Sequence, residues 1–177
     1  MKILIVEDGK DKRHSIRKAI QEIGDEEIET AKTYFSARKK ILSTKKYDLV
    51  ILDMFLPDAK DDNKLNGLAG KDLVFDVMDE GINVPILVVT QYTEYTNNSA
   101  NNKREYGSIP DALENRTYGK PINDDKKGSY DCTYYEGLHQ YLSSEVPMYL
   151  GIVFYSNYIN TWKNSLTYFV KKVQEEL

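Results

Sequence analysis

The chain has 177 residues, of which 41% are hydrophobic and 29% charged, and its formal net charge is −4. This composition is typical of a compact globular domain with a sizeable core, and the acidic balance does not favour a nucleic-acid partner. No apolar run approaches the roughly 20 residues of a membrane-spanning helix, the N-terminus turns acidic too early for a signal peptide, and a single cysteine, Cys132, excludes an internal disulfide. We therefore expect a cytoplasmic protein without a membrane or nucleic-acid partner.

Four short segments in the first half of the chain predict strands, and all except residues 28–31 are mainly apolar runs. They cover residues 2–6, 28–31, 49–52 and 84–90. Unbroken apolar runs of this length are typical of strands that are buried on both faces of a parallel sheet. Apolar residues at helical spacing predict a helix in each of the three intervals, and Thr33 is placed to cap the second helix. Pro57 follows the third strand and is expected to end regular pairing, with a polar loop over residues 58–66.

The chain changes character after Thr90, because 12 of its 14 tyrosines lie beyond that residue. Residues 92–116 have little apolar periodicity, and we interpret about 91–130 as a long insertion after the fourth strand. A helix over 131–144, a strand over 149–155 and a helix over 159–173 follow. Strands that alternate with crossover helices predict an α/β fold, a doubly wound five-stranded parallel sheet with helices on both faces. We expect residues 1–177 to form a single domain.

Polar side chains follow the buried strands at the point where each strand ends. Glu7 and Asp8 come after the first strand, Asp53 after the third, and Thr90 ends the fourth. Carboxyl ends of parallel strands line one edge of an open α/β sheet. Clustered carboxylates raise one another's pKa unless a cation neutralises them, and their hard oxygen atoms suit Mg²⁺. Asp53 could then act as a nucleophile toward a phosphoryl donor and form an acyl phosphate.

These residues give the chain a specific resemblance to the response-regulator receiver domains of two-component signalling. That family has an acidic pair after the first strand, an Asp followed by a Pro after the third, a Thr or Ser ending the fourth, and a Lys-Pro ending the fifth. The corresponding residues here are Glu7-Asp8, Asp53 with Pro57, and Thr90. The resemblance extends from Lys2 to Thr90 and implies a flavodoxin-like receiver fold.

The resemblance also implies roles for these side chains. Asp53 would accept a phosphoryl group from a histidine kinase or phosphotransfer protein. Asp8, Asp53 and the backbone carbonyl of Phe55 would bind Mg²⁺, while Glu7 would hold metal-bound water. Thr90 would bond a phosphoryl oxygen. We further hypothesise that the Phe55 ring screens Asp53 from attacking water.

A stand-alone receiver of this kind would be a phospho-accepting switch that catalyses at most its own phosphorylation and dephosphorylation. It would not be an enzyme with a separate substrate. Its output would be a contact with an unknown downstream protein, or with a second copy in a homodimer. We expect residues 92–160 to build that surface, because they form the enlarged, tyrosine-rich part of the chain.

The fifth strand, which in the family ends in a lysine, has two candidates in this sequence. Lys120-Pro121 matches the family dipeptide, but residues 115–119 before it make a weak strand. Residues 148–155 make a stronger strand that is followed directly by the final helix. If the stronger strand is the fifth, Phe154-Tyr155-Ser156 takes the place of the lysine and Lys120 lies in the insertion.

Other functions are also compatible with parts of this pattern. Gln91 stands where the family has a small residue, which keeps open a receiver-like protein-binding module that does not switch. A haloacid-dehalogenase phosphatase also uses an aspartate at a strand end, but Phe55 occupies the position of its second acid. Taken singly, each acidic residue could be a turn or cap residue, and both histidines are expected at the surface. The placement of the acids on successive strand ends is what favours the receiver.

Overall fold

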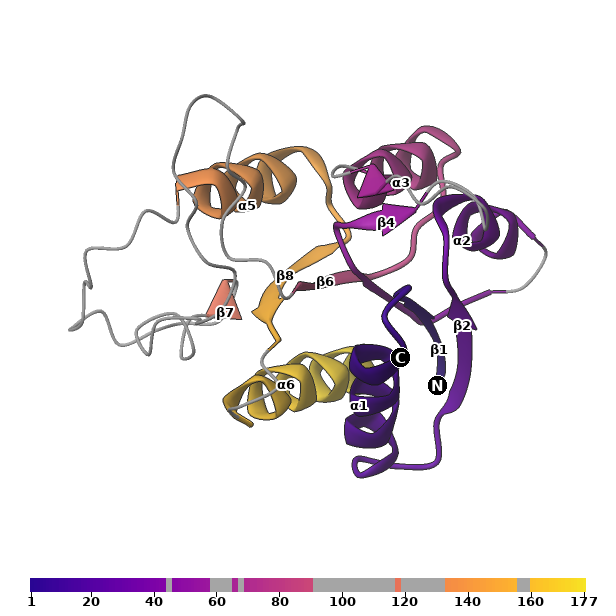
Figure 1. The fold of residues 1–177 in the computed structure, drawn as a ribbon, viewed down its shortest axis with the longest axis vertical. Helices are drawn as coiled ribbons and strands as arrows, with labels where there is room; N and C mark the ends of the chain where they lie inside the picture. The colour runs from indigo at the N-terminus through magenta and orange to yellow at the C-terminus, as the bar shows by residue number, and fades with distance from the viewer. Residues whose placement is uncertain (44–45, 58–64, 67–68, 91–116, 119–132, 156–159) are drawn as a thin grey trace.

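The computed structural model describes residues 1–177 except 44–45, 58–64, 67–68, 91–116, 119–132 and 156–159 (Figure 1). In chain order the elements are β1 (Lys2–Val6), α1 (Lys10–Gln21), β2 (Glu27–Ala31), α2 (Tyr34–Ile41), β3 (Leu49–Leu52), β4 (Leu56–Pro57), β5 (Leu65–Asn66), α3 (Ala69–Asp79), β6 (Ile86–Thr90), β7 (Thr117–Tyr118), α5 (Thr133–Glu145), β8 (Tyr149–Phe154) and α6 (Thr161–Glu176).

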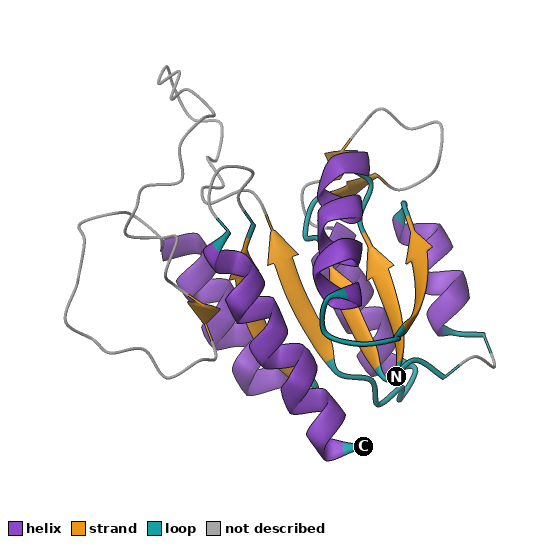
Figure 2. Cartoon of the chain, turned by 90° about the horizontal axis from the view of Figure 1, so that it is seen from below, coloured by secondary structure: helices purple, strands orange, loops and turns teal. Residues whose placement is uncertain are grey.

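The main sheet has the strand order β2-β1-β3-β6-β8-β7. The first five strands in this order are mutually parallel, and only β7 runs antiparallel, along the outer edge of β8. Figure 2 shows the arrowheads of the parallel strands at one end of the sheet. The prediction of a doubly wound five-stranded parallel sheet is therefore confirmed, with one short antiparallel strand added.

The fifth parallel strand is β8, which settles the choice between the two candidates in the sequence. The weaker candidate, residues 115–119, supplies only the two residues of β7. Lys120 follows β7 and lies outside the described residues.

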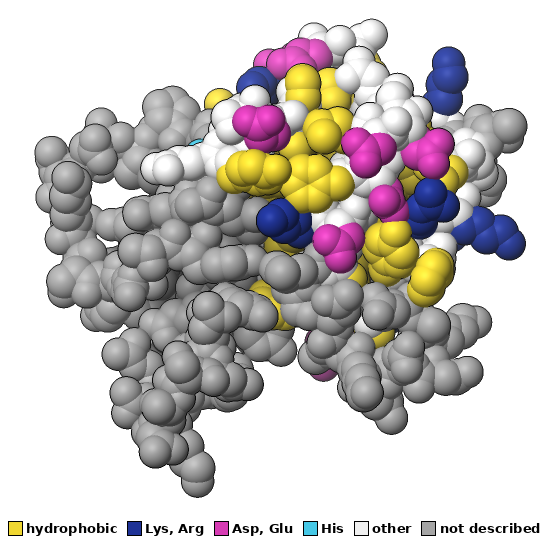
Figure 3. Space-filling view, turned by 90° about the horizontal axis from the view of Figure 1, so that it is seen from above, with side chains coloured by type: hydrophobic (Ala, Val, Ile, Leu, Met, Phe, Trp, Pro, Cys, Tyr) yellow, Lys and Arg dark blue, Asp and Glu magenta, His cyan; other side chains and the backbone are white. Residues whose placement is uncertain are grey.

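Helices cover both faces of the sheet. In Figure 1, α2, α3 and α5 lie on one face, and α1 and α6 lie on the other. Alternate residues of each strand therefore enter different cores: on β3, Val50 and Leu52 pack under the first set of helices, whereas Leu49 and Ile51 pack under the second. This double burial is the physical reason that the inner strands β3 and β6 are almost entirely apolar, whereas the edge strand β2 is only partly buried and contains polar residues. The helical face formed by α2, α3 and α5 carries apolar, acidic and basic side chains side by side (Figure 3).

Two local expectations had different outcomes. The capping role of Thr33 is confirmed, because its hydroxyl accepts the Ser36 N–H and the Ser36 hydroxyl accepts the Thr33 N–H. At Pro57 the structure adds a pairing that the sequence did not predict: Leu56 and Pro57 form β4, which ends at Pro57 and pairs antiparallel with β5 inside the expected polar loop. A two-residue ladder tolerates proline because its carbonyl can still accept a hydrogen bond.

A β-bulge near the start of β8 adjusts the pairing with β6. Ile86 is opposite Tyr149 but Leu87 is opposite Gly151, so that one residue of β8 is extra. Gly151 has φ of 151°, a backbone conformation that glycine adopts without strain. Beyond the bulge the register runs evenly, and the ends of the two strands, Thr90 and Phe154, lie side by side.

None of the helices in the described part of the chain is long and apolar enough to cross a membrane.

Candidate functional site

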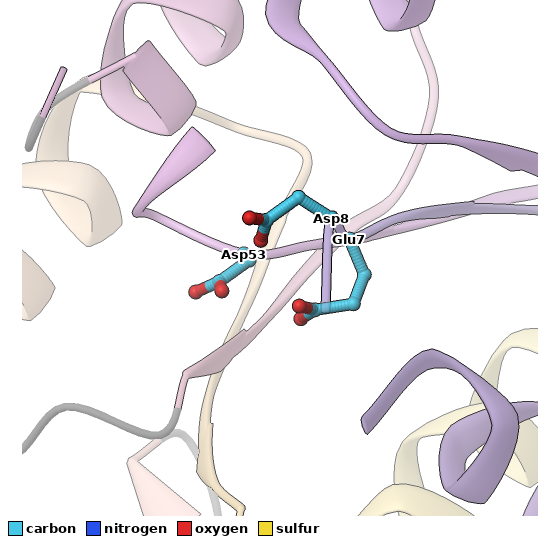
Figure 4. Close-up of side chains that lie close together, drawn as sticks. All are labelled: Glu7, Asp8 and Asp53. Carbon is cyan, nitrogen blue, oxygen red and sulfur yellow. The ribbon is translucent and has the colours of Figure 1, made fainter. Parts of the chain in front are cut away.

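The acidic residues of the sequence motif come together at the carboxyl edge of the sheet. Because Val6 and Leu52 are paired across β1 and β3, the residues that follow them leave the sheet side by side. The Asp53 N–H donates to the Val6 carbonyl at 2.9 Å, which continues the ladder by one bond. Glu7, Asp8 and Asp53 each offer a carboxylate oxygen, and these atoms lie within 4.8 Å of one another (Figure 4).

The three carboxylates differ in their exposure to solvent. Glu7 and Asp53 are buried, with 3% and 5% exposure, whereas Asp8 is exposed. In Figure 4 the side chains of Asp8 and Asp53 project to the same side, and that of Glu7 bends the other way. Burial is the largest influence on Glu7 and raises the pKa of that carboxyl above its ordinary value. The cluster thus has two buried carboxylates, Glu7 and Asp53, and one carboxylate that is open to water, Asp8.

Backbone and side-chain donors hold the acidic pair in place. The Gly9 N–H donates to Glu7 Oε1 at 2.9 Å. Arg13, on the first turn of α1, donates from Nη1 to the carbonyl oxygens of Glu7 and Asp8 at 2.8 and 2.9 Å. The turn between β1 and α1 is therefore fixed by the helix that follows it.

The segment after β3 is fixed in a similar way. The Phe55 N–H lies 3.4 Å from Asp53 Oδ1, and the ring of Phe55 is half-buried against the core. Gly70, in the first turn of α3, donates its N–H to the Met54 carbonyl at 3.1 Å. A Cβ at Gly70 would lie 2.4 Å from the Asp53 carbonyl oxygen, so only glycine permits this close approach.

Thr90 ends β6, the next strand of the sheet after β3, and is fully buried. Its carbonyl accepts the N–H of Tyr155, the residue after β8, at 2.8 Å. The Tyr155 ring is buried against Trp162 of α6, with centroids 4.8 Å apart. In the part of the chain that the structure describes, the end of the fifth strand therefore holds the aromatic residues Phe154 and Tyr155, and no lysine.

Lys12 is a member of this cluster that the sequence reading missed. It is the third residue of α1 and only 5% exposed, and its Nζ lies 2.6 Å from Glu7 Oε2 and 2.9 Å from Asp53 Oδ2. Burial alone would lower the pKa of this ammonium, but the two carboxylates outweigh burial and raise the pKa above its ordinary value. The ammonium group is thus held charged between the two buried acids.

A signal for Lys12 was present in the sequence. The buried residues of α1 are Lys12, Ile16, Ala19 and Ile20, so the lysine occupies a position of the apolar stripe itself. A lysine is rarely buried unless it is paired. Lys12 therefore lies on the inward face of a helix that begins next to the acidic pair. This placement indicates that the lysine pairs with those acids.

The donor set fits a divalent cation such as Mg²⁺. All three groups are hard carboxylate oxygen donors, and Asp8 is exposed, which leaves room for the water molecules that Mg²⁺ usually retains. Three carboxylates against one ammonium leave two formal negative charges, which one divalent cation would match. The two contacts of Lys12 engage Glu7 Oε2 and Asp53 Oδ2, and they leave Asp53 Oδ1 on the side of Phe55.

Comparison with known proteins agrees with this arrangement. The sequence model of one family, described as the response regulator receiver domain, matches residues 3–105, which is more than half of the chain. The chain therefore belongs to the response-regulator receiver domains of two-component signalling. A similar protein is the Detocs response regulatory protein DtcB of Enterobacter cloacae (strain JD6301), which is 33% identical over 107 residues, 56% of this chain and 71% of that protein.

Two solved structures resemble the fold over almost the whole chain. A signal receiver domain from Vibrio parahaemolyticus superposes with a TM-score of 0.55 at 18% identity, over 99% of this chain and 93% of its own. A CheY-like receiver domain from Methanospirillum hungatei JF-1 has a TM-score of 0.52 at 17% identity, over 98% and 94% of the two chains. At these identities the likeness concerns the fold alone, and it supports the flavodoxin-like architecture.

Proposed function

We propose that this receiver accepts a phosphoryl group on Asp53 in a Mg²⁺-dependent reaction and signals through a contact with another protein. The observation that carries the proposal is the convergence of Glu7, Asp8 and Asp53 at one edge of the sheet, with a carboxylate oxygen of each within 4.8 Å of the others. Among these, Asp53 leaves the central strand β3 and lies between the acidic pair of β1 and Thr90 of β6.

In the proposed reaction an oxygen of the Asp53 carboxylate attacks the phosphorus of a phosphohistidine. A P–O bond forms and the P–N bond breaks; the leaving imidazole nitrogen keeps the electron pair and takes a proton from solvent. Asp8, Asp53 and the Phe55 carbonyl would hold the cation, with Glu7 bonded to its water. Bound Mg²⁺ would supply electrostatic stabilisation of the charge on the transferring phosphoryl oxygens.

Thr90 completes the proposed site from the neighbouring strand. A hydroxyl at the end of β6 can donate to a phosphoryl oxygen on Asp53, because β3 and β6 are paired up to Leu52 and Val88. The Thr90 backbone also accepts the N–H of Tyr155. A movement of Thr90 on phosphorylation would therefore displace the backbone of Tyr155 at the end of β8, through this hydrogen bond.

We further propose the setting in which this site works. The phosphoryl donor is a histidine kinase or phosphotransfer protein, and residues 1–177 act as one cytoplasmic domain with its insertion at about 91–130. The output is a contact with a downstream protein or a second copy through residues 92–160, which lie largely outside the described residues. Beyond its own phosphorylation and dephosphorylation the domain has no catalytic activity.

Phosphoryl transfer is tested with acetyl phosphate and Mg²⁺ on the full chain. The wild type should gain the mass of one phosphoryl group, and Asp53→Asn should gain none, because the amide is not nucleophilic. Removal of Mg²⁺ with a chelator should abolish the gain. A mass gain of equal size in Asp53→Asn would contradict the assignment of the acceptor.

A second candidate is a receiver-like binding module that does not switch. The observation that favours it is Tyr155, a buried aromatic at the end of the fifth strand where the family has lysine. On this alternative neither acetyl phosphate nor beryllofluoride with Mg²⁺ would alter the mass or the NMR spectrum. An Asp53-dependent change of either would exclude it.

A further inference from the structure

The site just described contains a cation that the proposed reaction has not yet used. Lys12 is the only lysine among the described residues that lies within 4.0 Å of Asp53 or Glu7. It comes from α1, the helix that follows β1, and not from the fifth parallel strand, where the family has its lysine. Its position therefore needs an explanation of its own.

A purely structural role explains the position poorly. An ammonium group that is 95% buried loses most of its hydration, and a buried ion pair is on average no more stabilising than apolar residues of the same volume. The neighbouring inward positions of α1, Ile16, Ala19 and Ile20, are apolar and pack in the core. An apolar residue at position 12 would have continued that stripe.

The geometry of the ammonium leaves bonding capacity for a further acceptor. An ammonium has three N–H donors and no acceptor. Both contacts of Lys12 are close ion pairs, but its Nζ meets the alignment of a hydrogen bond in neither. A phosphoryl group on Asp53 would place its oxygens next to the Asp53 carboxylate that Nζ already contacts at 2.9 Å.

The end of the fifth strand offers no competing cation in the part that the structure describes. Phe154 packs in the core under α2, α3 and α5, and Tyr155 packs in the core under α1 and α6, so the two side chains enter opposite faces of the sheet. The Tyr155 backbone N–H is used by the Thr90 carbonyl. Phe154 and Tyr155 therefore pack in the two hydrophobic cores and do not supply a binding group.

We propose that Lys12 of α1 is the phosphoryl-binding cation of this receiver and takes over the role that the family gives to a lysine at the end of the fifth strand. The inference rests on the proposed phosphorylation of Asp53. Lys12 holds Glu7 and Asp53 together before the reaction. During transfer its N–H groups bind an oxygen of the phosphoryl group that bonds to Asp53, and afterwards they hold the acyl phosphate against α1.

The experiment compares full-length Lys12→Met, which keeps an unbranched side chain but removes the charged ammonium group, with Lys18→Met, an exposed position in the last turn of the same helix. Affinity for beryllofluoride at saturating Mg²⁺ and the rate of phosphorylation by acetyl phosphate should fall about 100-fold in Lys12→Met, as for the loss of one donor to a developing oxyanion. Affinity for Mg²⁺ alone should stay the same or rise, because a positive charge beside the metal ligands is gone. Lys18→Met should match the wild type.

A loss of beryllofluoride affinity without a loss of Mg²⁺ affinity separates a phosphoryl ligand from a structural residue. A purely structural Lys12 would lower both affinities together, and an ammonium that only competes with the metal would raise both in Lys12→Met; either result overturns the inference. Lys120→Met is measured in parallel, and a 100-fold loss there with none in Lys12→Met also overturns it. If wild type itself shows no Asp53-dependent response, the proposed function fails and this inference fails with it.

A structure of the wild type with Mg²⁺ and beryllofluoride decides the question even if Lys12→Met does not fold. Lys12 Nζ should lie within hydrogen-bond distance of a fluoride on Asp53. A fluoride bound instead by another lysine, with Lys12 turned away, would rule out the proposal while leaving the phosphorylation of Asp53 intact.

Discussion

The strands up to β6 and the strand that comes after the insertion end in different ways. Residues that can bind a cation or a phosphoryl group follow β1 and β3 directly and end β6, whereas β8 ends in Phe154 and is followed by Tyr155, two aromatic residues that are buried in the two cores. All the charged groups of the cluster lie between Glu7 and Asp53 in the sequence. The difference teaches that, in the described residues, the first part of the chain supplies the chemistry and the later strand supplies packing behind it.

The sharpest test of this division is the contact of α3 with the segment after β3. In Gly70→Ala the new methyl group would meet the Asp53 carbonyl at 2.4 Å and the Met54 Cα at 2.6 Å, both of them backbone atoms. We expect a loss of about 2–3 kcal/mol in the free energy of unfolding, measured by urea denaturation. Phosphorylation of Asp53 should slow at least about tenfold, because the displaced backbone carries the acceptor.

Gly24→Ala is the matched control for Gly70→Ala. Its nearest neighbour would be Glu26 Oε1 at 3.5 Å, an ordinary contact, and the residue lies far from the acidic cluster in the sequence. We expect its stability and its phosphorylation rate to match the wild type. Equal rates in Gly70→Ala and Gly24→Ala would mean that the site does not depend on the seating of α3.

A second test removes the clamp on the acidic pair, that is, the two hydrogen bonds from Arg13 to the backbone of Glu7 and Asp8. Arg13→Met loses two hydrogen bonds to the carbonyls of Glu7 and Asp8, which lets the turn before α1 relax. Partners of metal ligands typically contribute 10- to 100-fold to metal affinity, and we expect Mg²⁺ binding about tenfold weaker by calorimetry. Arg17→Met, at an exposed position one turn further along α1, is the control. Unchanged Mg²⁺ affinity in Arg13→Met would show that the turn holds its shape without the clamp.

A third test concerns the ring beside Asp53. The half-buried ring of Phe55 follows the acceptor by two residues, and its own N–H faces Asp53 Oδ1. In Phe55→Asn a polar amide replaces the apolar screen, and we expect the acyl phosphate to hydrolyse about threefold faster because water is less well excluded. The lifetime of the phosphorylated form, followed by intact mass, measures this. An unchanged lifetime would remove the screening role of Phe55.

The smallest predicted effect lies in the second half of the chain. His139 of α5 is half-buried, its Nδ1 lies 3.0 Å from the Tyr149 hydroxyl, and burial lowers the pKa of its imidazole below the ordinary 6.5. The folded state therefore favours neutral histidine: this contribution to the free energy of unfolding is present above pH 6.5 and is lost as the pH falls through the lower folded pKa. His139→Gln should flatten the decline in stability between pH 7 and pH 5, measured by urea titration. His14→Gln, on the exposed side of α1, is the control, and identical profiles for wild type and His139→Gln would contradict the assignment.

The sequence predicted the parallel strands and the edge on which they end because burial on both faces leaves a direct trace, an unbroken apolar run. It also indicated that Glu7, Asp8 and Asp53 would meet, since that follows from strand pairing alone. It could not choose between the two fifth-strand candidates with certainty, because a family dipeptide favoured Lys120 and strand propensity favoured β8. Propensity was the better guide, because β8 pairs with a strand on either side and its last four residues are buried between helices on both faces.

Other features depended on contacts that a linear pattern does not show. The pairing of β4 with β5 was not predicted, because these two-residue segments are separated by a polar stretch that carries no strand pattern. Both histidines were expected at the surface; His14 is exposed, whereas His139 is half-buried and contacts the hydroxyl of Tyr149, ten residues further on, which the sequence did not indicate. Lys12 was passed over because the search for a cation followed the family's strand and not the inward face of α1.

The packing of Trp162 on Tyr155 gives this protein a built-in optical reporter. Trp162 is the chain's single tryptophan, so its emission comes from one place, and that place is one ring contact away from the residue whose amide is bonded to Thr90. A displacement of Thr90 would move Tyr155 through the backbone hydrogen bond, and the Tyr155 ring would change the surroundings of the Trp162 indole. Real-time fluorescence of the unlabelled protein could therefore follow events at the acceptor without a dye or an added tag.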